Sequence, residues 1–334
     1  KKILVCIVIA CMLSFTMANT LTSVMNTIEL KEKFDRMNQR SNVNNRPIIG
    51  VLAQPRSDGK TQYIASSYIK FVEGAGGRAV PIMYDLSRDE LRKEFSRING
   101  LLFPGGGVSL DDGSKYLEVQ RFLLELAHEA NDQGDYFPVW ATCLGFEAVT
   151  IITGNAQVLT QTDAWNISYP LQFVQETAMH SKLFSSAPEH VLKILSEQPV
   201  TLNNHHWGVS PDVFSSNKQL EAYWNVLSTN TDRNGKPFVS TIEAKDYPVW
   251  GVQYHPEKVQ YEWTVREVIP HSFDAIMANS YFANFFVNEA RRNMHQYPSI
   301  AAENDALIYN YNPVFSYKLN HSDFQQIYIF PTNA

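Results

Sequence analysis

The chain has few cysteines, no dense cluster of basic residues and no long hydrophobic run beyond its first residues. Only three of its 334 residues are cysteine, and 28 Lys and Arg against 34 Asp and Glu give a formal charge of −6. Because binding to phosphates needs a basic surface, nucleic acid is not expected as a partner. The 44% of hydrophobic residues is typical of a globular protein and excludes collagen-like, coiled-coil and wholly disordered chains.

The first eighteen residues have the pattern of a secretory signal peptide. Lys1 and Lys2 form a basic start, an apolar run extends from Ile3 to Phe15, and Ala18 is a small residue at a suitable cleavage point. The alternative is a membrane anchor, but a run of about 13 apolar residues is too short to span a bilayer. We therefore expect a signal peptide over 1–18, a polar leader or linker over 19–45, and no membrane association after cleavage.

Cysteine usage directs attention to one residue. Cys6 and Cys11 lie in the predicted signal, so the processed chain keeps only Cys143. A single cysteine cannot form an internal disulfide, and a domain of this size can be stable through core burial alone. An unpaired thiol in an oxidising pathway is a liability unless it is buried or functional. Cys143 is therefore a candidate functional residue.

Short apolar runs alternate with amphipathic segments through the first half of the chain. The continuous apolar run 47–52 is typical of a strand buried in a parallel sheet. Further strands are expected at 78–83, 100–103, 137–141 and 249–254, and helices at 64–74, 88–95, 115–131, 144–153 and 273–291. This alternation predicts an α/β fold with three layers, in which helices cover both faces of a doubly wound, mostly parallel sheet.

The second half of the chain is less regular. Residues 155–247 contain short strand-like runs between turns rich in Asn, Ser and Pro. The α/β domain is expected to span 46–296. A C-terminal extension over 297–334 should pack on it, with possible strands at 307–309 and 327–329.

Cys143 stands between a predicted strand and a predicted helix. This is the pattern of a nucleophile elbow, a sharp turn that exposes a reactive side chain at the carboxyl end of a strand. The small residues Ala141 and Gly145 would let the backbone approach its neighbours. The helix dipole and a neighbouring imidazole are expected to lower the pKa of the thiol. The alternative is a buried cysteine that packs as a small apolar residue.

His255 is the best candidate for the base that a cysteine nucleophile needs. It follows an apolar strand and precedes Pro256, which should place it at the carboxyl edge of the sheet, where ligands collect in open α/β folds. Glu257 could accept a hydrogen bond from the second imidazole nitrogen and fix its tautomer. The alternative is a surface His-Pro turn beside a solvated glutamate.

A glycine-rich loop follows the strand expected at 100–103. The backbone N–H groups of Gly105 and Gly106, together with that of Leu144, are expected to form an oxyanion hole. The alternatives are a flexible loop or a phosphate cradle, but no Lys-Ser/Thr pair follows to make a P-loop.

A pair of histidines and two Asn-X-Ser triplets give less specific indications of function. His205 and His206 lack further ligands at workable spacing, so no metal is expected there, although one of the pair could line the pocket. Asn166 and Asn320 begin Asn-X-Ser triplets and are potential glycan sites in a secreted chain.

Six longer motifs stand along the chain: Tyr63-Ile-Ala-Ser-Ser-Tyr68, Phe103-Pro-Gly-Gly106, Asp135-Tyr-Phe-Pro-Val-Trp140, Thr142-Cys-Leu-Gly-Phe-Glu147, Gly251-Val-Gln-Tyr-His-Pro-Glu-Lys258 and Phe285-Phe-Val-Asn-Glu-Ala-Arg291. With these motifs the chain resembles the γ-glutamyl hydrolase family, within the class I glutamine-amidotransferase-like superfamily, from about Arg46 to Phe330. It departs from the family pattern at Ala141, where Gly is usual, and at Tyr254, where Trp is usual.

The resemblance implies an omega peptidase that hydrolyses γ-glutamyl amide bonds in folylpoly-γ-glutamates and antifolate polyglutamates. It implies a γ-glutamyl thioester intermediate and no cofactor. The family works in lysosomes, vacuoles or the extracellular space, which agrees with the predicted signal peptide. A homodimer is also expected.

The resemblance further implies roles for individual residues. Cys143 would be the nucleophile, His255 its acid and base, and Glu257 the residue that supports the imidazole. Tyr68, Glu147 and His205 would lie near the substrate, with Glu147 binding the α-amino group of the γ-glutamyl unit. Two alternatives remain: a glutaminase module that supplies ammonia to a synthetase, although no synthetase domain follows here, and a non-catalytic binding protein on the same fold.

Overall fold

The computed structural model describes residues 43–316 and 323–333. The predicted signal peptide, residues 19–42 of the predicted leader and the Asn320 triplet lie outside the described residues.

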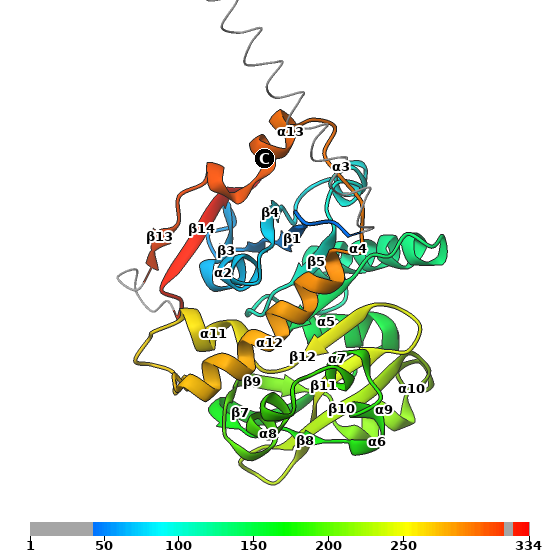
Figure 1. The fold of residues 1–334 in the computed structure, drawn as a ribbon, viewed down its shortest axis with the longest axis vertical. Helices are drawn as coiled ribbons and strands as arrows, with labels where there is room; N and C mark the ends of the chain where they lie inside the picture. Colours follow the sequence, from blue (N-terminus) through cyan, green and yellow to red (C-terminus); the bar gives the residue numbers. More distant parts are fainter. Residues whose placement is uncertain (1–42, 317–322, 334) are drawn as a thin grey trace, which may run out of the picture.

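An eight-stranded sheet forms the centre of the structure (Figure 1). In spatial order its strands are β4 (Arg78–Ile82), β1 (Ile48–Leu52), β5 (Gly100–Phe103), β6 (Val139–Thr142), β12 (Val249–Val252), β11 (Pro237–Ala244), β10 (Trp224–Thr231) and β8 (Gln172–Phe173). Neighbouring strands from β4 to β12 are parallel. Strands β11, β10 and β8 each run antiparallel to the strand before them. The predicted mostly parallel sheet is confirmed.

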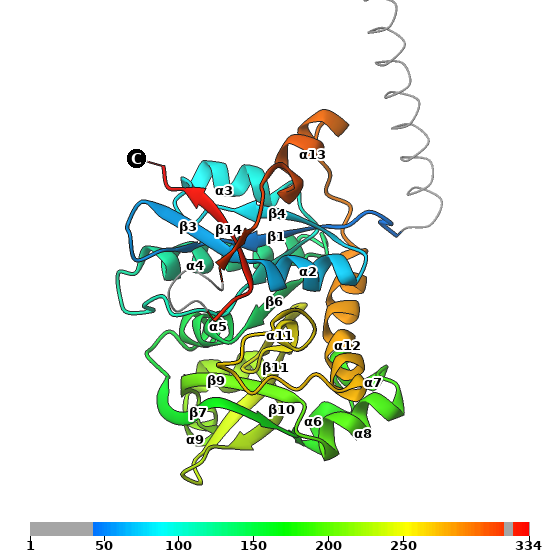
Figure 2. The same cartoon turned by 90° about the vertical axis from the view of Figure 1, so that its left-hand side faces the viewer.

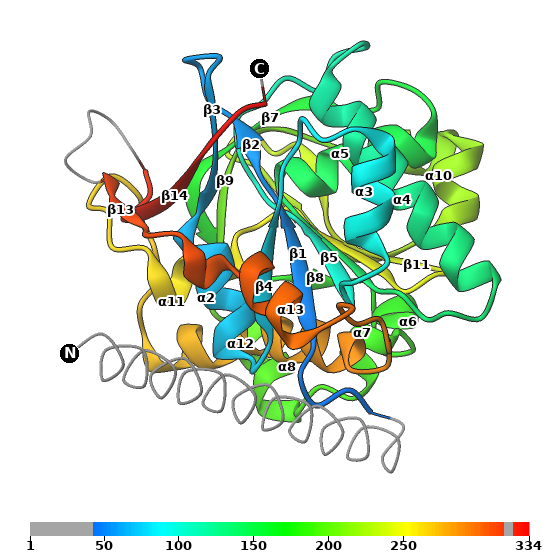
Figure 3. The ribbon, with the colours of Figure 1, turned by 90° about the horizontal axis from the view of Figure 1, so that it is seen from above.

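Helices cover both faces of this sheet (Figure 3). On one side lie α3 (Arg88–Phe95), α4 (Lys115–Asp132), α5 (Leu144–Gly154) and α10 (Lys218–Tyr223), and on the other α2 (Ser66–Gly74), α11 (Pro256–Tyr261) and α12 (Phe273–Ala290). Alternate residues of a strand point to opposite faces. Accordingly, Val139 and Ala141 of β6 join one buried apolar cluster, while Trp140 joins the other. This is the predicted three-layer arrangement.

Two smaller sheets flank the central one. Strands β7 (Thr160–Tyr169) and β9 (Thr201–Gly208) form an antiparallel pair. The second small sheet has the order β13 (Val314–Phe315), β14 (Gln326–Pro331), β3 (Thr61–Ala65) and β2 (Gln54–Pro55). The remaining elements are α6 (Gln175–Ala178), α7 (Lys182–Ser185), α8 (Glu189–Glu197), α9 (Pro211–Ser216), α13 (Ile300–Ala306) and the 3-10 helix η1 (Ile308–Asn310).

Two predicted elements differ from the observed ones. The helix expected at 64–74 begins only at Ser66, because residues 61–65 pair as β3 with β14 over the register from Thr61↔Pro331 to Ala65↔Ile327 (Figure 2). That pairing joins segments far apart in the sequence, which local patterns do not reveal. The strand expected at 307–309 is wrong, since η1 occupies this segment.

Both ends of the described chain pack on the domain. The Asn44 amide donates to the Arg291 carbonyl at 2.7 Å, so residues 43–45, expected in the leader, contact the domain. Glu303 of α13 forms ion pairs with Arg46, at 2.7 Å, and with Arg78.

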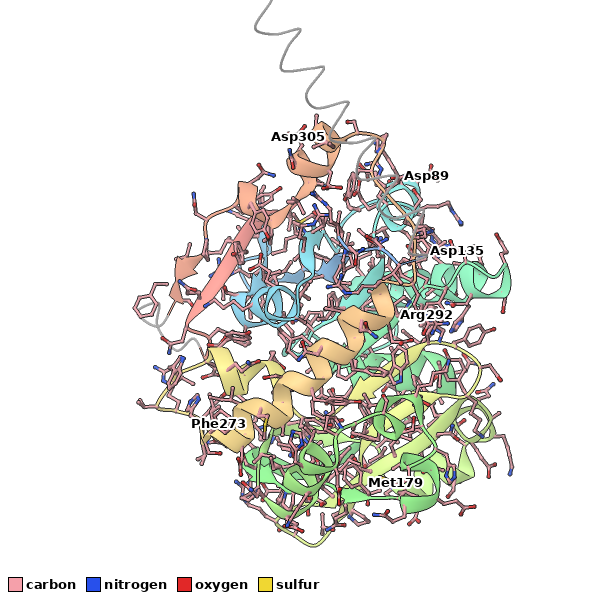
Figure 4. The ribbon with its side chains drawn as sticks, in the orientation of Figure 1. Asp89, Asp135, Met179, Phe273, Arg292 and Asp305 are labelled. Atoms are coloured by element: carbon pink, nitrogen blue, oxygen red, sulfur yellow. The ribbon has the colours of Figure 1, made fainter. Side chains whose placement is uncertain are left out.

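The segment after α12 is held against the loop that follows α4. Figure 4 labels Asp135 and Arg292 near the C-terminal end of α12. The Arg292 guanidinium lies 3.6 Å from the Tyr136 ring centroid, and His295 Nε2 lies 2.6 Å from Asp135 Oδ2. In the part of the chain that the structure describes, no helix has both the length and the apolar character needed to cross a membrane.

Candidate active site

Cys143 occupies the sharp turn between β6 and α5. Its backbone has φ 50° and ψ −106°, a conformation that costs roughly 1–3 kcal/mol and that the surroundings must hold in place. Its amide donates to the Val252 carbonyl of β12 at 2.8 Å. A Cβ on Gly145 would fall on the Phe103 carbonyl oxygen, so only glycine fits two positions after the cysteine. The predicted elbow is therefore present.

His255 and Glu257 lie where β12 gives way to α11. His255 caps this helix and Pro256 is its first residue. The imidazole Nδ1 lies 2.8 Å from Glu257 Oε1, with both side chains at most 5% exposed. A Cβ placed on Gly105 would be 2.7 Å from His255 Cε1 and 3.0 Å from Cys143 Cβ, so the imidazole and the thiol flank this glycine closely. The structure thus brings the three predicted catalytic residues together.

The glycine loop is held by two side chains from the N-terminal part of the domain. The Gly105 amide donates to Tyr68 Oη at 2.8 Å, and the Gly105 carbonyl accepts from Gln54 Nε2 at 2.7 Å. A Cβ on Gly106 would fall on the Gln54 amide. While the Tyr68 hydrogen bond holds, the Gly105 amide is not available to an oxyanion. Of the predicted donors, Gly106 and Leu144 remain.

Tyr68 lies behind the catalytic residues. It is 1% exposed, and burial together with the nearby Glu257 charge raises the pKa of its hydroxyl well above the usual value. It does not line the cavity described below. The expectation that Tyr68 contacts substrate is not supported, and its contacts suit a residue that positions Gly105 and Glu257. Gln54, its counterpart on the carbonyl side, was missed because a buried glutamine carries no sequence signature.

The pKa of the Cys143 thiol differs from the sequence-based prediction. Burial, and then the charges of Glu147 and Glu257, raise the pKa of Cys143 well above its usual value, while Lys258 and the Leu144 amide act in the opposite direction. The expected lowering of the pKa is therefore wrong. Desolvation of a side chain that is 4% exposed outweighs the helix terminus. The resting residue is a thiol that must lose its proton during the reaction.

A cavity of about 680 Å³ opens beside Cys143. It is lined by residues 106–111, 143, 144, 147, 157, 159, 165 and 204–207. The lining includes Glu147 and His205, as predicted, and in the described residues it includes no lysine or arginine. The carboxyl of Glu147 accepts from Gln253 Nε2 at 3.0 Å, and burial raises its pKa to about 8.

His205 is a neutral residue of the cavity wall. Burial lowers its pKa to about 3, although the hydrogen bond to the Trp207 carbonyl acts in the opposite direction. Its Nδ1 donates to the Trp207 carbonyl at 2.7 Å. His205 therefore fixes the backbone of β9 beside the cavity. In residues 43–316 and 323–333, no group of three or more His, Cys, Asp and Glu side chains is arranged to hold a metal ion.

A buried ion pair supports this region from outside the cavity. Lys258 Nζ lies 2.6 Å from Glu267 Oε1, and the two side chains are 2% and 3% exposed. Glu267 also accepts from Asn204 Nδ2 at 2.7 Å, which links α11 to β9. Sequence reasoning missed this network because Lys258 and Glu267 are residues that usually lie in solvent.

Comparison with known proteins decides the family. Residues 47–257, which include Cys143, His255 and Glu257, match the family model described as peptidase C26. The chain belongs to the peptidase C26 family. It is a hydrolytic cysteine peptidase, and the family resemblance inferred from the motifs is confirmed.

Three known proteins are similar to this chain over most of its length. Gamma-glutamyl hydrolase B from Dictyostelium discoideum is 41% identical over 298 residues, covering 87% of this chain and 85% of that protein. Gamma-glutamyl hydrolase from Homo sapiens is 44% identical over 292 residues, with coverages of 85% and 90%. Gamma-glutamyl hydrolase 1 from Arabidopsis thaliana is 36% identical over 298 residues, with coverages of 86% and 84%.

Proposed function

We propose that this peptidase C26 member hydrolyses γ-glutamyl amide bonds, with Cys143 as nucleophile, His255 as general acid and base, and Glu257 as the supporting carboxylate. The observation that carries the proposal is that Cys143 and His255 flank Gly105, with Glu257 2.8 Å from the His255 imidazole, beside a cavity that also contains Glu147. The names of the relatives support the choice of bond. Every group that the chemistry needs is supplied by the chain itself.

Acylation begins with a proton transfer. Neutral His255 accepts the Sγ–H proton as the sulfur attacks the γ-carbonyl carbon, because the buried thiol has too high a pKa to ionise beforehand. The amides of Gly106 and Leu144 stabilise the oxyanion that forms. Glu257, 2.8 Å from Nδ1, stabilises the imidazolium.

The intermediate then collapses and is hydrolysed. The imidazolium gives its proton to the leaving amine as the C–N bond breaks, which leaves a γ-glutamyl thioester on Cys143. Neutral His255 next removes a proton from water, the hydroxide adds to the thioester carbonyl, and the sulfur leaves as the thiol after it regains the proton. Both products depart and the enzyme returns to its starting state.

The environment of Glu147 favours a chain of γ-linked glutamates as substrate. In such a chain the α-nitrogen is an amide N–H, whereas free glutamine carries an α-ammonium group. With a pKa of about 8, Glu147 is mostly protonated at pH 7 and can accept from an amide N–H and donate to an α-carboxylate. This replaces the expected charged contact with an α-amino group. We infer folylpoly-γ-glutamates as the substrate class.

Location and assembly belong to the same proposal. The basic and apolar pattern of residues 1–18 supports entry into the secretory pathway and activity in a lysosome, vacuole or the extracellular space. A homodimer is proposed from the family resemblance. Amino-terminal sequencing of the protein recovered from a secreting cell and sedimentation analysis test these two points.

The test of function uses mass spectrometry of products from a pteroyl chain with several γ-linked glutamates. Wild type should shorten the glutamate chain, and Cys143→Ala should leave it intact. Ammonia release from glutamine, followed under the same conditions, should be far slower. A higher kcat/KM for glutamine than for the pteroyl peptide would overturn the proposal in favour of a glutaminase.

A further inference from the structure

Helix α11 carries a catalytic side chain but is too short to hold itself in place. It spans only Pro256–Tyr261, with Glu257 in its first turn and His255 as its N-cap. Isolated helices of this length are not stable in water, so tertiary contacts must fix its position. The His255 amide donates to the Leu202 carbonyl of β9 at 2.8 Å, which fixes the N-terminal end of the helix. The C-terminal end, at Glu262, needs a support of its own.

The support at Glu262 comes from the C-terminal part of the chain. Glu262 is the C-cap of α11 and is 1% exposed. Its Oε2 accepts from the Gln325 amide at 2.6 Å, a contact between residues 63 positions apart. One turn earlier in α11, Lys258 Nζ lies 5.1 Å from the centroid of the Phe324 ring. Two consecutive residues of the C-terminal extension therefore contact two side chains of this helix region.

The same extension is tied to the element that carries Tyr68. Residues 324–325 lead into β14, which pairs with β3 along the whole length of β3 and has one end beside α11 in Figure 1. Lys70 Nζ of α2 donates to Gln326 Oε1 at 2.8 Å. Because β3 runs directly into α2, this pairing also fixes the helix from which Tyr68 reaches the Gly105 amide. The extension thus joins α11 to the support of the glycine loop.

Glu262 serves in this contact as a hydrogen-bond acceptor. Burial raises its pKa to about 7, although the hydrogen bond from the Gln325 amide acts in the opposite direction. A buried carboxyl group that is partly neutral at pH 7 can be replaced by a carboxamide without loss of an acceptor oxygen. Glutamine at this position should therefore preserve the contact, whereas alanine removes it.

We propose that Glu262 is a positioning residue for the hydrolysis, and that Phe324 and Gln325 of the C-terminal extension are the partners through which it acts. Together they fix the C-terminal end of α11, and with it the Glu257 carboxylate at the other end of this short helix. The proposal rests on the proposed function, in which Glu257 stabilises the imidazolium of His255.

Glu303 provides a matched control in the same extension. It lies in α13 and forms ion pairs with Arg46, at 2.7 Å, and with Arg78. Arg46 precedes β1 and Arg78 begins β4, so both partners lie at the amino ends of parallel strands, whereas Cys143 follows the carboxyl end of β6. Glu303→Ala therefore reports what a weaker attachment of the extension does at a distance from α11.

Steady-state kinetics with one γ-glutamyl peptide tests the role of Glu262. In Glu262→Ala, kcat should fall about tenfold with little change in KM, and Glu262→Gln should recover most of the loss. Glu303→Ala should lower the melting temperature but leave kcat at the wild-type value, in an assay run well below each melting transition. An unchanged kcat in Glu262→Ala, or an equal fall in Glu303→Ala, overturns the proposal.

A double-variant cycle shows whether the effect passes through Glu257. In a chain that already carries Glu257→Gln, the further change Glu262→Ala should lower kcat by less than about threefold, because residues that act as a unit have non-additive effects. A second full tenfold loss in Glu257→Gln/Glu262→Ala would mean that Glu262 acts by another route and overturns the proposal.

The Gln325 amide can be removed without changing a buried side chain. Gln325→Pro lacks the N–H donor, whereas Gln325→Ala keeps it. The proline variant should reproduce the fall in kcat, and the alanine variant should match wild type. This pair decides the question even if Glu262→Ala does not fold. A folded Gln325→Pro variant with the kcat of wild type overturns the proposal.

Hydrogen exchange separates this proposal from the proposed function, because it needs no turnover. Amides of residues 256–262 should exchange faster in Glu262→Ala and Gln325→Pro than in wild type, and at the wild-type rate in Glu303→Ala. If wild type hydrolyses no γ-glutamyl peptide, the proposed function fails while this measurement still decides whether Glu262 fixes the helix. Exchange at the wild-type rate in all three variants overturns the positioning role.

Discussion

The two walls of the Cys143 cavity differ in how deeply their side chains are buried and in how well they should tolerate substitution. The elbow wall is almost fully buried: Cys143 and His255 are each 4% exposed, and Gly145 has no room for a Cβ. The β7–β9 wall leaves Trp165 and Trp207 about half exposed. A reacting thiol needs fixed neighbours and exclusion of water, whereas recognition of a flat group needs only an accessible ring. Substitutions on the first wall should therefore remove turnover, and those on the second should change selectivity.

The largest effect is expected for Cys143→Ala. Alanine fits the elbow but offers no nucleophile, so hydrolysis should fall by at least about 10⁴-fold. The melting temperature should stay close to that of wild type, because the substitution removes a single sulfur atom. Product release followed by mass spectrometry and a thermal melt measure the two quantities. Substantial residual hydrolysis would remove Cys143 from the role of nucleophile.

Lys258→Met tests the buried support of the elbow wall. It leaves the Glu267 carboxylate buried without its cation, which should lower the free energy of unfolding by about 3–5 kcal/mol. Urea unfolding measures the loss. The double variant Lys258→Met/Glu267→Met is the control, because it removes both charges and should recover much of the stability. If the single variant is as stable as wild type, the ion pair does not support the site.

Glu257→Gln should have a smaller effect on catalysis than loss of the nucleophile. The glutamine oxygen can still accept from His255 Nδ1, but it cannot stabilise the imidazolium as a carboxylate does. We expect kcat to fall roughly 10- to 100-fold with little change in KM. Steady-state kinetics with one γ-glutamyl peptide gives both values. A variant as inactive as Cys143→Ala would mean that Glu257 takes part more directly.

The smallest effect concerns the pH dependence of thiol labelling. Because burial raises the pKa of Cys143, alkylation by iodoacetamide without substrate should be slower at pH 7 than that of a free cysteine. The rate should rise about tenfold per pH unit and reach no plateau below the usual cysteine pKa. The urea-unfolded chain, whose thiol is solvated, is the control. Fast labelling at pH 6 that is independent of pH would show a pre-formed thiolate.

Much of the central architecture follows from the sequence by itself. The buried run 47–52 and the helices at 88–95 and 144–153 have local periodicities that chain neighbours determine, and the structure has them with at most small changes at their ends. The elbow at Cys143 was also predictable, since a small residue, a cysteine and a glycine between a strand and a helix already define its local geometry.

Other features depend on contacts between distant segments, and only the tertiary structure decided them. Residues 61–65 became a strand because β14 pairs with them, and Tyr68 was directed to Gly105 instead of the cavity. The pKa of Cys143 rose because the folded chain buries it, a desolvation that no local motif encodes. Trp165 and Trp207 line the same cavity because β7 and β9 pair as neighbouring strands, although α6, α7 and α8 lie between them in the sequence. Local preference selects the elements, but burial and long-range pairing determine which side chains share a site.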